Sequence, residues 1–296
     1  MSGFRESLKD SPEYRAVLTA VQKRRLPLGV LGLSAIHKAH IADALCAALR
    51  KRALIVMPDE ASATKLTEDL NTLGMSALLY PEREFVFHTA TETHSHEYEQ
   101  RRLKALTAML AGNVQAVVCA VSAAMQYTVP PEELQKRACT LKVGKDIKIE
   151  SVVSVLLESG YTRCDMVEGA GQFSLRGGIL DLFSPGEENP VRVEFFGDTV
   201  DSMSYFDIRS QRRNERLTEF ALMPAKEVLF DSDRVLIEKI EALSKTLKGK
   251  HAAKQKEALF SDIDRLKSGV KLNSTDKYLP LAFSSAQTVF DYADEN

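Results

Sequence analysis

The first half of the chain alternates short apolar runs with segments of helical periodicity, and this alternation constrains the fold more than any other feature. The predicted strands cover residues 26–33, 53–57, 77–80 and 115–121, and the predicted helices cover residues 12–24, 36–51, 61–73 and 97–111. Strands that are apolar on both faces and are separated by helices form parallel sheets with helices on both sides. The first half is therefore predicted to be an α/β domain.

The pattern changes near Cys139 and changes back near Pro224. Between these points a helix is predicted over residues 149–159, and residues 173–205 read as strands joined by turns, which is typical of an antiparallel sheet. Two short flanking pieces cannot bury cores of their own. We therefore expect residues 1–138 and 224–296 to form one parallel-sheet domain, split by an inserted α+β domain with an antiparallel sheet at residues 139–223.

The strongest local signal is a β-hairpin in VRVEFF-GD-TVDSMSYF, with a two-residue turn at Gly197-Asp198. Regular pairing from this turn places the like charges of Glu194 and Asp201 opposite each other, which is unfavourable. Strand alternation then predicts the core face, which consists of Val191, Val193, Phe195, Val200 and Phe206. The opposite face is predicted to hold Arg192, Glu194, Phe196, Thr199, Asp201 and Met203.

Phe196 is unusual on this second face, because it is a large apolar ring among charged residues. An exposed aromatic ring beside an arginine has the composition of an interface anchor. Alternatively, a helix or loop of the same domain covers the ring. The residues alone leave both interpretations open.

A degenerate phosphate-binding loop follows the first predicted strand, where nucleotide-binding α/β proteins carry G-x-x-x-x-G-K-[ST]. Gly32 and Lys38 are in register, but His37 replaces the second glycine and Ala39 replaces the Mg²⁺-binding hydroxyl. These replacements argue against ATP hydrolysis. Asp59, which follows the second strand, is interpreted as a helix cap and not as a catalytic carboxylate.

Composition excludes several functional classes. Lysine and arginine number 39 against 41 aspartate and glutamate, a net charge of −2 that argues against a dedicated duplex binder. Neither a membrane span nor a secretory signal is predicted, so we expect a cytoplasmic protein. The four cysteines lie far apart, which favours buried thiols over disulfides or a zinc site.

Two further groups of residues could bind a ligand. The residues His88, His94 and His96 lie in a polar loop without a matched carboxylate or thiol, so we expect neither a metal nor a cofactor there. The run from Lys245 to Lys256 is either a solvated helix face or a weak phosphate-contact patch.

Several motifs together resemble a known module. They are R-G-G-x-x-D-x-F at residues 176–183, R-x-x-F-F-x-D at 192–198, Phe206-Asp207 and Ser210-Gln211-Arg212. This combination resembles the module shared by the excision-repair helicase UvrB and the bacterial transcription-repair coupling factors (Mfd). A degenerate phosphate-binding loop, and the absence of room for the long DNA-clamping hairpin of UvrB, favour the amino-terminal module of the coupling factors.

The resemblance implies a fold, a function and contact residues. It implies a degenerate RecA-like domain, split by an inserted domain that binds UvrA, the damage-recognition ATPase. Carried over onto this sequence, the contact residues are Arg176, Arg192 and Phe196. The chain would then be a non-enzymatic fragment that recruits UvrA to stalled RNA polymerase, while polymerase and duplex DNA bind to regions absent here.

Two competing functions remain from the residues alone. One is a nucleotide-dependent helicase-type domain that uses Lys38, and the other is a DNA-binding module that uses the lysine run. We also expect truncation of the three contact residues to weaken UvrA binding and to change stability little.

Overall fold

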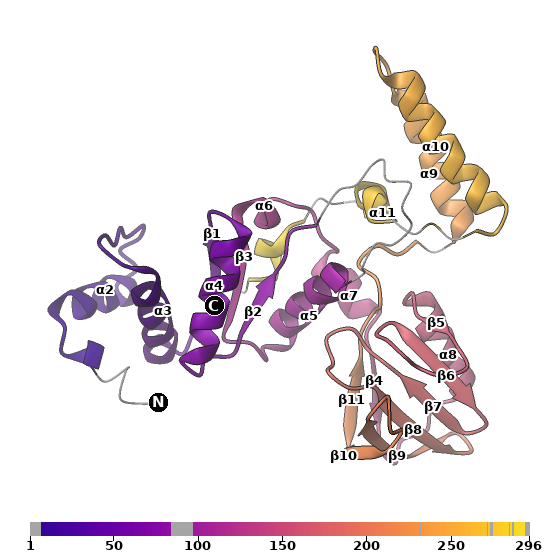
Figure 1. The fold of residues 1–296 in the computed structure, drawn as a ribbon, viewed down its shortest axis with the longest axis horizontal. Helices are drawn as coiled ribbons and strands as arrows, with labels where there is room; N and C mark the ends of the chain where they lie inside the picture. Colours follow the sequence, from indigo (N-terminus) through magenta and orange to yellow (C-terminus); the bar gives the residue numbers. More distant parts are fainter. Residues whose placement is uncertain are drawn as a thin grey trace. The chain divides into compact units, whose positions relative to one another are not determined.

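The computed structural model describes residues 7–83, 97–230, 232–270, 272, 275–283, 285 and 287–293. The chain divides into two compact units. The first unit contains residues 1–83, 104–126 and 288–296, and the second contains residues 84–103 and 127–287. Each unit is described by itself below (Figure 1).

The first unit contains a parallel sheet of β1 (Ala53–Met57), β3 (Ala116–Ala120) and β2 (Ala77–Tyr80), in that order. Both ladders are parallel, with Ala53 and Ala77 each opposite Ala116. The parallel α/β prediction is therefore confirmed for these three strands.

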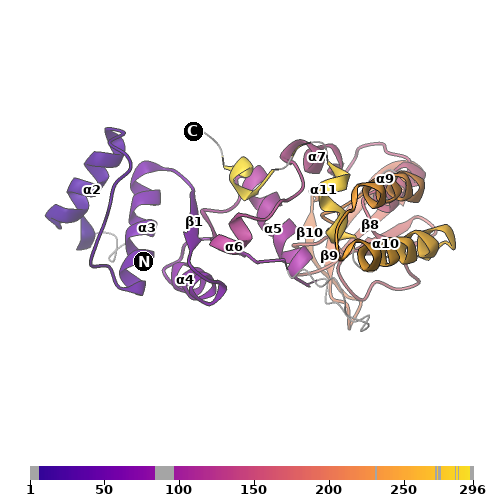
Figure 2. The ribbon, with the colours of Figure 1, turned by 90° about the horizontal axis from the view of Figure 1, so that it is seen from above.

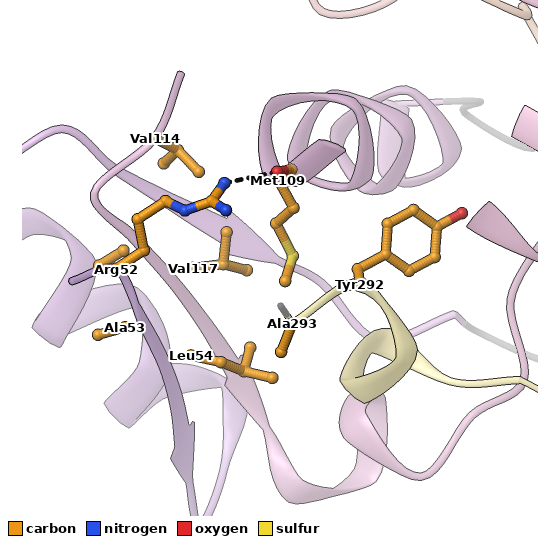
Figure 3. A pocket seen from close by; sticks show the side chains of 9 residues that line it. Arg52, Ala53, Leu54, Met109, Val114, Val117, Tyr292 and Ala293 are labelled. Carbon is orange, nitrogen blue, oxygen red and sulfur yellow. Dashed lines mark hydrogen bonds between the residues drawn. The ribbon is translucent and has the colours of Figure 1, made fainter. Parts of the chain in front are cut away.

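Helices cover both faces of this sheet. The helix α4 (Glu60–Thr72) packs on one face through Leu66 and Leu70, and α3 (Ala35–Leu49) packs against α4. On the other face, the end of α5 (Glu97–Ala111) and the short helix η2 (Val289–Tyr292) surround a cavity of about 70 Å³ (Figure 3). The last described residues thus belong to the same compact unit as the first ones.

The predicted strand at residues 26–33 is wrong. This segment lies between α2 (Pro12–Gln22) and α3 and has no regular secondary structure. Pro27 lacks a backbone N–H group, and Gly32 has a φ of +81°, so neither residue suits a strand interior. This apolar run therefore has the composition of a buried strand but does not form the hydrogen bonds of one.

The second unit contains a six-stranded sheet in the order β10-β9-β8-β7-β6-β5. Its strands are β5 (Thr162–Arg163), β6 (Gln172–Arg176), β7 (Ile179–Leu182), β8 (Val191–Phe196), β9 (Thr199–Phe206) and β10 (Arg213–Leu217). All neighbours are antiparallel except β5 and β6, which agrees with the antiparallel prediction. The helix α8 (Ile149–Glu158) packs its Val152 and Leu156 into the core on one face of this sheet.

The strands β4 (Cys139–Lys142) and β11 (Glu219–Leu222) form a separate antiparallel pair. Cys139 lies opposite Leu222, and Lys142 lies opposite Glu219. The two ends of the segment predicted as an inserted domain are therefore hydrogen-bonded neighbours.

The second unit also contains two long helices, α9 (Asp233–Thr246) and α10 (Ala252–Lys267), which lie side by side as an antiparallel hairpin (Figures 1 and 2). The remaining helices are α6 (Val121–Ala124), α7 (Pro131–Lys136), η1 (Asp276–Tyr278) and α11 (Leu279–Ala282). In the part of the chain that the structure describes, no helix combines the length and the apolar character needed to cross a membrane.

Candidate functional site

The hairpin β8–β9 has the predicted turn, and its first two residue pairs have the predicted register. A β-bulge then shifts the register, so that Glu194 lies opposite Ser202 and not opposite Asp201. The predicted like-charge pair is therefore wrong. The Ser202 hydroxyl donates a hydrogen bond to Glu194 at 2.7 Å, and Arg213 of β10 also donates to this carboxylate. These contacts, with the hydrogen bond from Ser202 as the largest, hold the pKa of Glu194 below its usual range.

The bulge also corrects two predicted side-chain directions. One extra residue in a strand turns every later side chain to the other face, because side chains alternate with a period of two. Met203 is consequently buried in the core opposite Val193, although the alternation predicted it on the polar face. Phe206 turns to the other face, where it is still fully buried, and the Arg192 guanidinium lies 4.5 Å from the centre of its ring.

A buried aspartate organises the polar face of the sheet. Asp181 of β7 lies directly opposite Arg192 of β8 and is only 2% exposed. Arg192 donates two hydrogen bonds to it, from Nε at 2.7 Å and from Nη2 at 2.9 Å. Arg176 of β6 donates a third from Nη2 at 2.8 Å. One carboxylate therefore holds two of the three predicted contact residues.

Arg192 is enclosed more fully than the hairpin pattern predicts. Only 14% of its side chain is exposed, and its Nη2 also donates to the Gln211 side chain at 3.0 Å. The hydrogen bonds to Asp181 raise the pKa of this guanidinium. Gln211 belongs to the Ser210-Gln211-Arg212 motif and has a φ of +58°, which places its amide beside Arg192.

Arg176 and Phe196 differ from Arg192 in being open to solvent. The Arg176 side chain is 51% exposed, and Phe196 is 83% exposed at the end of β8. The interpretation in which Phe196 is covered by its own domain therefore fails for the described residues. Ile179, opposite both Arg176 and Glu194, is 36% exposed, so it adds apolar surface on the same face.

Sequence reasoning missed the supporting residues of this site, namely Asp181, Phe206 and Gln211. All three belong to the sequence motifs on which the resemblance rests, so the motifs contained these residues although no role was assigned to them.

A close approach of two backbone segments is another feature that the sequence analysis did not predict. A Cβ on Gly178 would lie 2.9 Å from the carbonyl oxygen of Phe195, whose N–H group donates to the Gly178 carbonyl at 2.8 Å.

The segment interpreted as a degenerate phosphate-binding loop does not follow a strand, because residues 26–33 have no regular secondary structure. Gly32, His37 and Lys38 are exposed, and the His37 ring is hydrogen-bonded to the Ser34 hydroxyl at 3.1 Å. Ala39, at the position of the Mg²⁺-binding hydroxyl, is fully buried in the apolar layer between α3 and α4. A polar metal ligand at this position would therefore point into the core.

The other predicted candidates do not gather into a site. Among the described residues no cluster of three or more histidine, cysteine, aspartate or glutamate side chains could hold a metal ion. His88, His94 and His96 lie outside the described residues. Asp59 caps α4 by accepting a hydrogen bond from the Ser62 N–H group at 2.8 Å, as predicted.

Comparison with known proteins identifies relatives of the whole chain and of this site. The profile of the UvrB interaction domain family matches residues 139–228. The transcription-repair-coupling factor of Bacillus subtilis is 32% identical over 306 residues, which cover 100% of this chain and 26% of that protein. Those of Myxococcus xanthus and Haemophilus influenzae are 34% and 29% identical, over 68% and 82% of this chain. The chain thus spans about a quarter or less of the length of these relatives.

Proposed function

Since this chain belongs to the transcription-repair-coupling factors as their amino-terminal module and contains a UvrB interaction domain, we propose that it is a non-catalytic recruiting module that binds UvrA. In the longer protein it would bring UvrA to a stalled RNA polymerase and so start nucleotide excision repair there. Polymerase would be bound by other regions of that protein.

One observation carries this proposal above the others. Phe196 presents an almost fully exposed aromatic ring within the segment that matches the UvrB interaction domain. Aromatic and arginine residues are enriched among binding hot spots. Arg176 and Ile179 extend the same face, so the surface combines an apolar ring with a cation.

The three carried-over residues have different roles in this proposal. Phe196 and Arg176 contact UvrA directly, because both are open to solvent. Arg192 acts through Asp181, because it is enclosed and its guanidinium already donates hydrogen bonds to Asp181 and Gln211 within the domain. It fixes the carboxylate that also orients Arg176.

The other parts of the chain would act as a scaffold. We interpret the parallel sheet and α3 as part of a degenerate RecA-like domain, which residues 1–138 and 224–296 form around the inserted domain at residues 139–223. The enclosure of Ala39 supports the absence of ATP hydrolysis, because no Mg²⁺ ligand can be presented there.

A titration of UvrA against this chain and its variants tests the proposal. Truncation of a hot-spot side chain costs about 2 kcal/mol or more. Phe196→Ala and Arg176→Ala should therefore each weaken binding roughly thirtyfold. Phe260→Ala is the matched control, because Phe260 is an exposed aromatic on α10 outside the matched segment. Equal affinity for all these variants would show that this face does not bind UvrA.

A further inference from the structure

The hairpin of α9 and α10 separates its charges along its length. All acidic residues of the segment 233–267 lie outside its tip, and they are Asp233, Glu238, Glu241, Glu257, Asp262 and Asp264. Several of them form ion pairs, including Glu238 with Arg234 at 2.9 Å and Glu241 with Lys267 at 3.4 Å. The tip is defined as residues 242–256. All of its ionisable side chains are basic, and they are Lys245, Lys248, Lys250, His251, Lys254 and Lys256.

The lysines of the tip are available to a partner. Four of the five are exposed and Lys256 is partly buried. Within the described part of the chain, none of the five forms an ion pair, although lysines elsewhere in the same unit do, such as Lys136 with Glu133 at 2.6 Å. Lys145 and Lys226 of the same unit form no ion pair with the described residues either, so the tip is distinguished by the gathering of five such lysines within residues 242–256.

Helix stability does not account for this cluster. Lys245 lies in the last turn of α9, where a cation stabilises a helix, but this explains one residue only. Lys254 lies in the first turn of α10, where a cation is unfavourable and where the helix has no acidic residue. Lys248 and Lys250 lie in the connecting turn between the helices, where the helix ends do not explain them. The mutual repulsion of these lysines is therefore not offset by helix stability.

We propose that this tip is a contact surface for the phosphate backbone of duplex DNA. It contains no arginine, the residue that most often reads base edges by paired hydrogen bonds. It contains no phenylalanine, tyrosine or tryptophan on which unpaired bases could stack. Lysines that are not accompanied by arginine or aromatic residues bind phosphates as point charges, independently of the base sequence of the DNA.

The balanced net charge of the chain does not oppose this contact. The Debye length is about 8 Å at physiological ionic strength, so charges farther away than this are largely screened. Glu241 and Glu257 flank the tip closely enough to act on it, so the local balance is five lysines against two carboxylates, which is still a surplus of positive charge. This surface is separate from the proposed UvrA face and does not depend on that assignment.

The salt dependence of binding gives the sharpest test. Each phosphate neutralised contributes about −0.9 to the slope of log K against log salt. Five lysine contacts would give a slope near −4.5, so a fourfold rise in salt would lower affinity several hundredfold. We propose fluorescence anisotropy of a labelled random-sequence duplex of about 30 base pairs, titrated with the whole chain at several salt concentrations.

A tip variant carrying Lys248→Gln, Lys250→Gln and Lys254→Gln should reduce the slope by about 2.7 and weaken binding at low salt. The control variant carries Lys65→Gln, Lys136→Gln and Lys142→Gln, which change the net charge equally at lysines that are paired with acidic residues. It should bind as the parent does. The proposal is overturned if the parent does not bind duplex at low salt, or if both variants bind alike. Tighter binding of single-stranded DNA, or binding of polyglutamate without binding of duplex, also overturns it.

Discussion

Replacing Arg192 with alanine should destabilise the six-stranded sheet of the second unit strongly, in contrast to the small effect expected from the sequence. The substitution leaves the carboxylate of Asp181 2% exposed with a single remaining hydrogen bond, from Arg176. Removing one partner of a buried ion pair costs about 3–5 kcal/mol. Arg176 stays in place and Arg192 is itself slightly exposed, so we expect the lower end, about 3 kcal/mol.

For a protein of this size a loss of 1 kcal/mol lowers Tm by about 2–4 °C. The Arg192→Ala chain should therefore melt roughly 6–12 °C below the parent in calorimetry. Phe196→Ala should melt with the parent, because the ring is exposed. Adding Asp181→Ala to Arg192→Ala should recover part of the loss, because no charge is then left buried without its partner. If Arg192→Ala and Phe196→Ala melt together, Arg192 does not stabilise Asp181 and the division of roles proposed above is wrong.

Three more changes test separate parts of the structure. Gly178→Ala should cost about 1–3 kcal/mol in denaturant unfolding, because its Cβ would meet the Phe195 carbonyl, whereas an ordinary surface alanine would cost less. The lowered pKa of Glu194 means that its stabilisation is present above the unfolded value of about 4.3 and is lost as pH falls through the folded value. The stability gap between the parent and Glu194→Gln should therefore shrink below about pH 4 in melts across pH, and a constant gap would contradict this sign. Neither the parent nor Lys38→Ala should release phosphate from Mg-ATP above background, and turnover that Lys38→Ala abolishes would restore the enzyme hypothesis.

The local sequence pattern was sufficient to predict individual strands and helices. The strands β1, β2 and β3 could be predicted because each is a short continuous apolar run, and the helix α8 because its buried residues repeat at helical spacing. The segment at residues 26–33 has the same apolar composition, but Pro27 lacks a backbone N–H donor and Gly32 has a positive φ that a strand does not adopt. Composition alone could not separate these two cases.

The candidate site shows a second limit. The hairpin turn is encoded in two adjacent residues, whereas the bulge depends on how β9 pairs with its neighbours. A one-residue shift then turned Met203 into the apolar core and turned Phe206 to the other face, where it is buried beneath Arg192. The role of Asp181 could not be predicted either. It depends on β7 lying between β6 and β8, and the sequence did not predict the turns that connect these strands.

Long-range ion pairs are the hardest features to predict. The buried guanidinium of Arg102 donates hydrogen bonds to Glu227 at 2.9 and 3.2 Å, and these residues are 125 positions apart. Neither residue has a local pattern that marks it as buried. Such a pair can be recognised only once the topology has brought α5 next to the segment that follows β11.

The pairing of β4 with β11 has a consequence for how such a chain can be built and rebuilt. Cys139 and Leu222 lie directly opposite each other, so everything between them begins and ends at one point in space. A host protein can gain or lose such a segment without changing the distance that its own chain must span, and the entropy of closing the bridge depends only weakly on its length. Cutting the chain outside Cys139 and Leu222 should therefore release a portable module with its ends already joined by hydrogen bonds, which could be grafted into the turn of an unrelated scaffold.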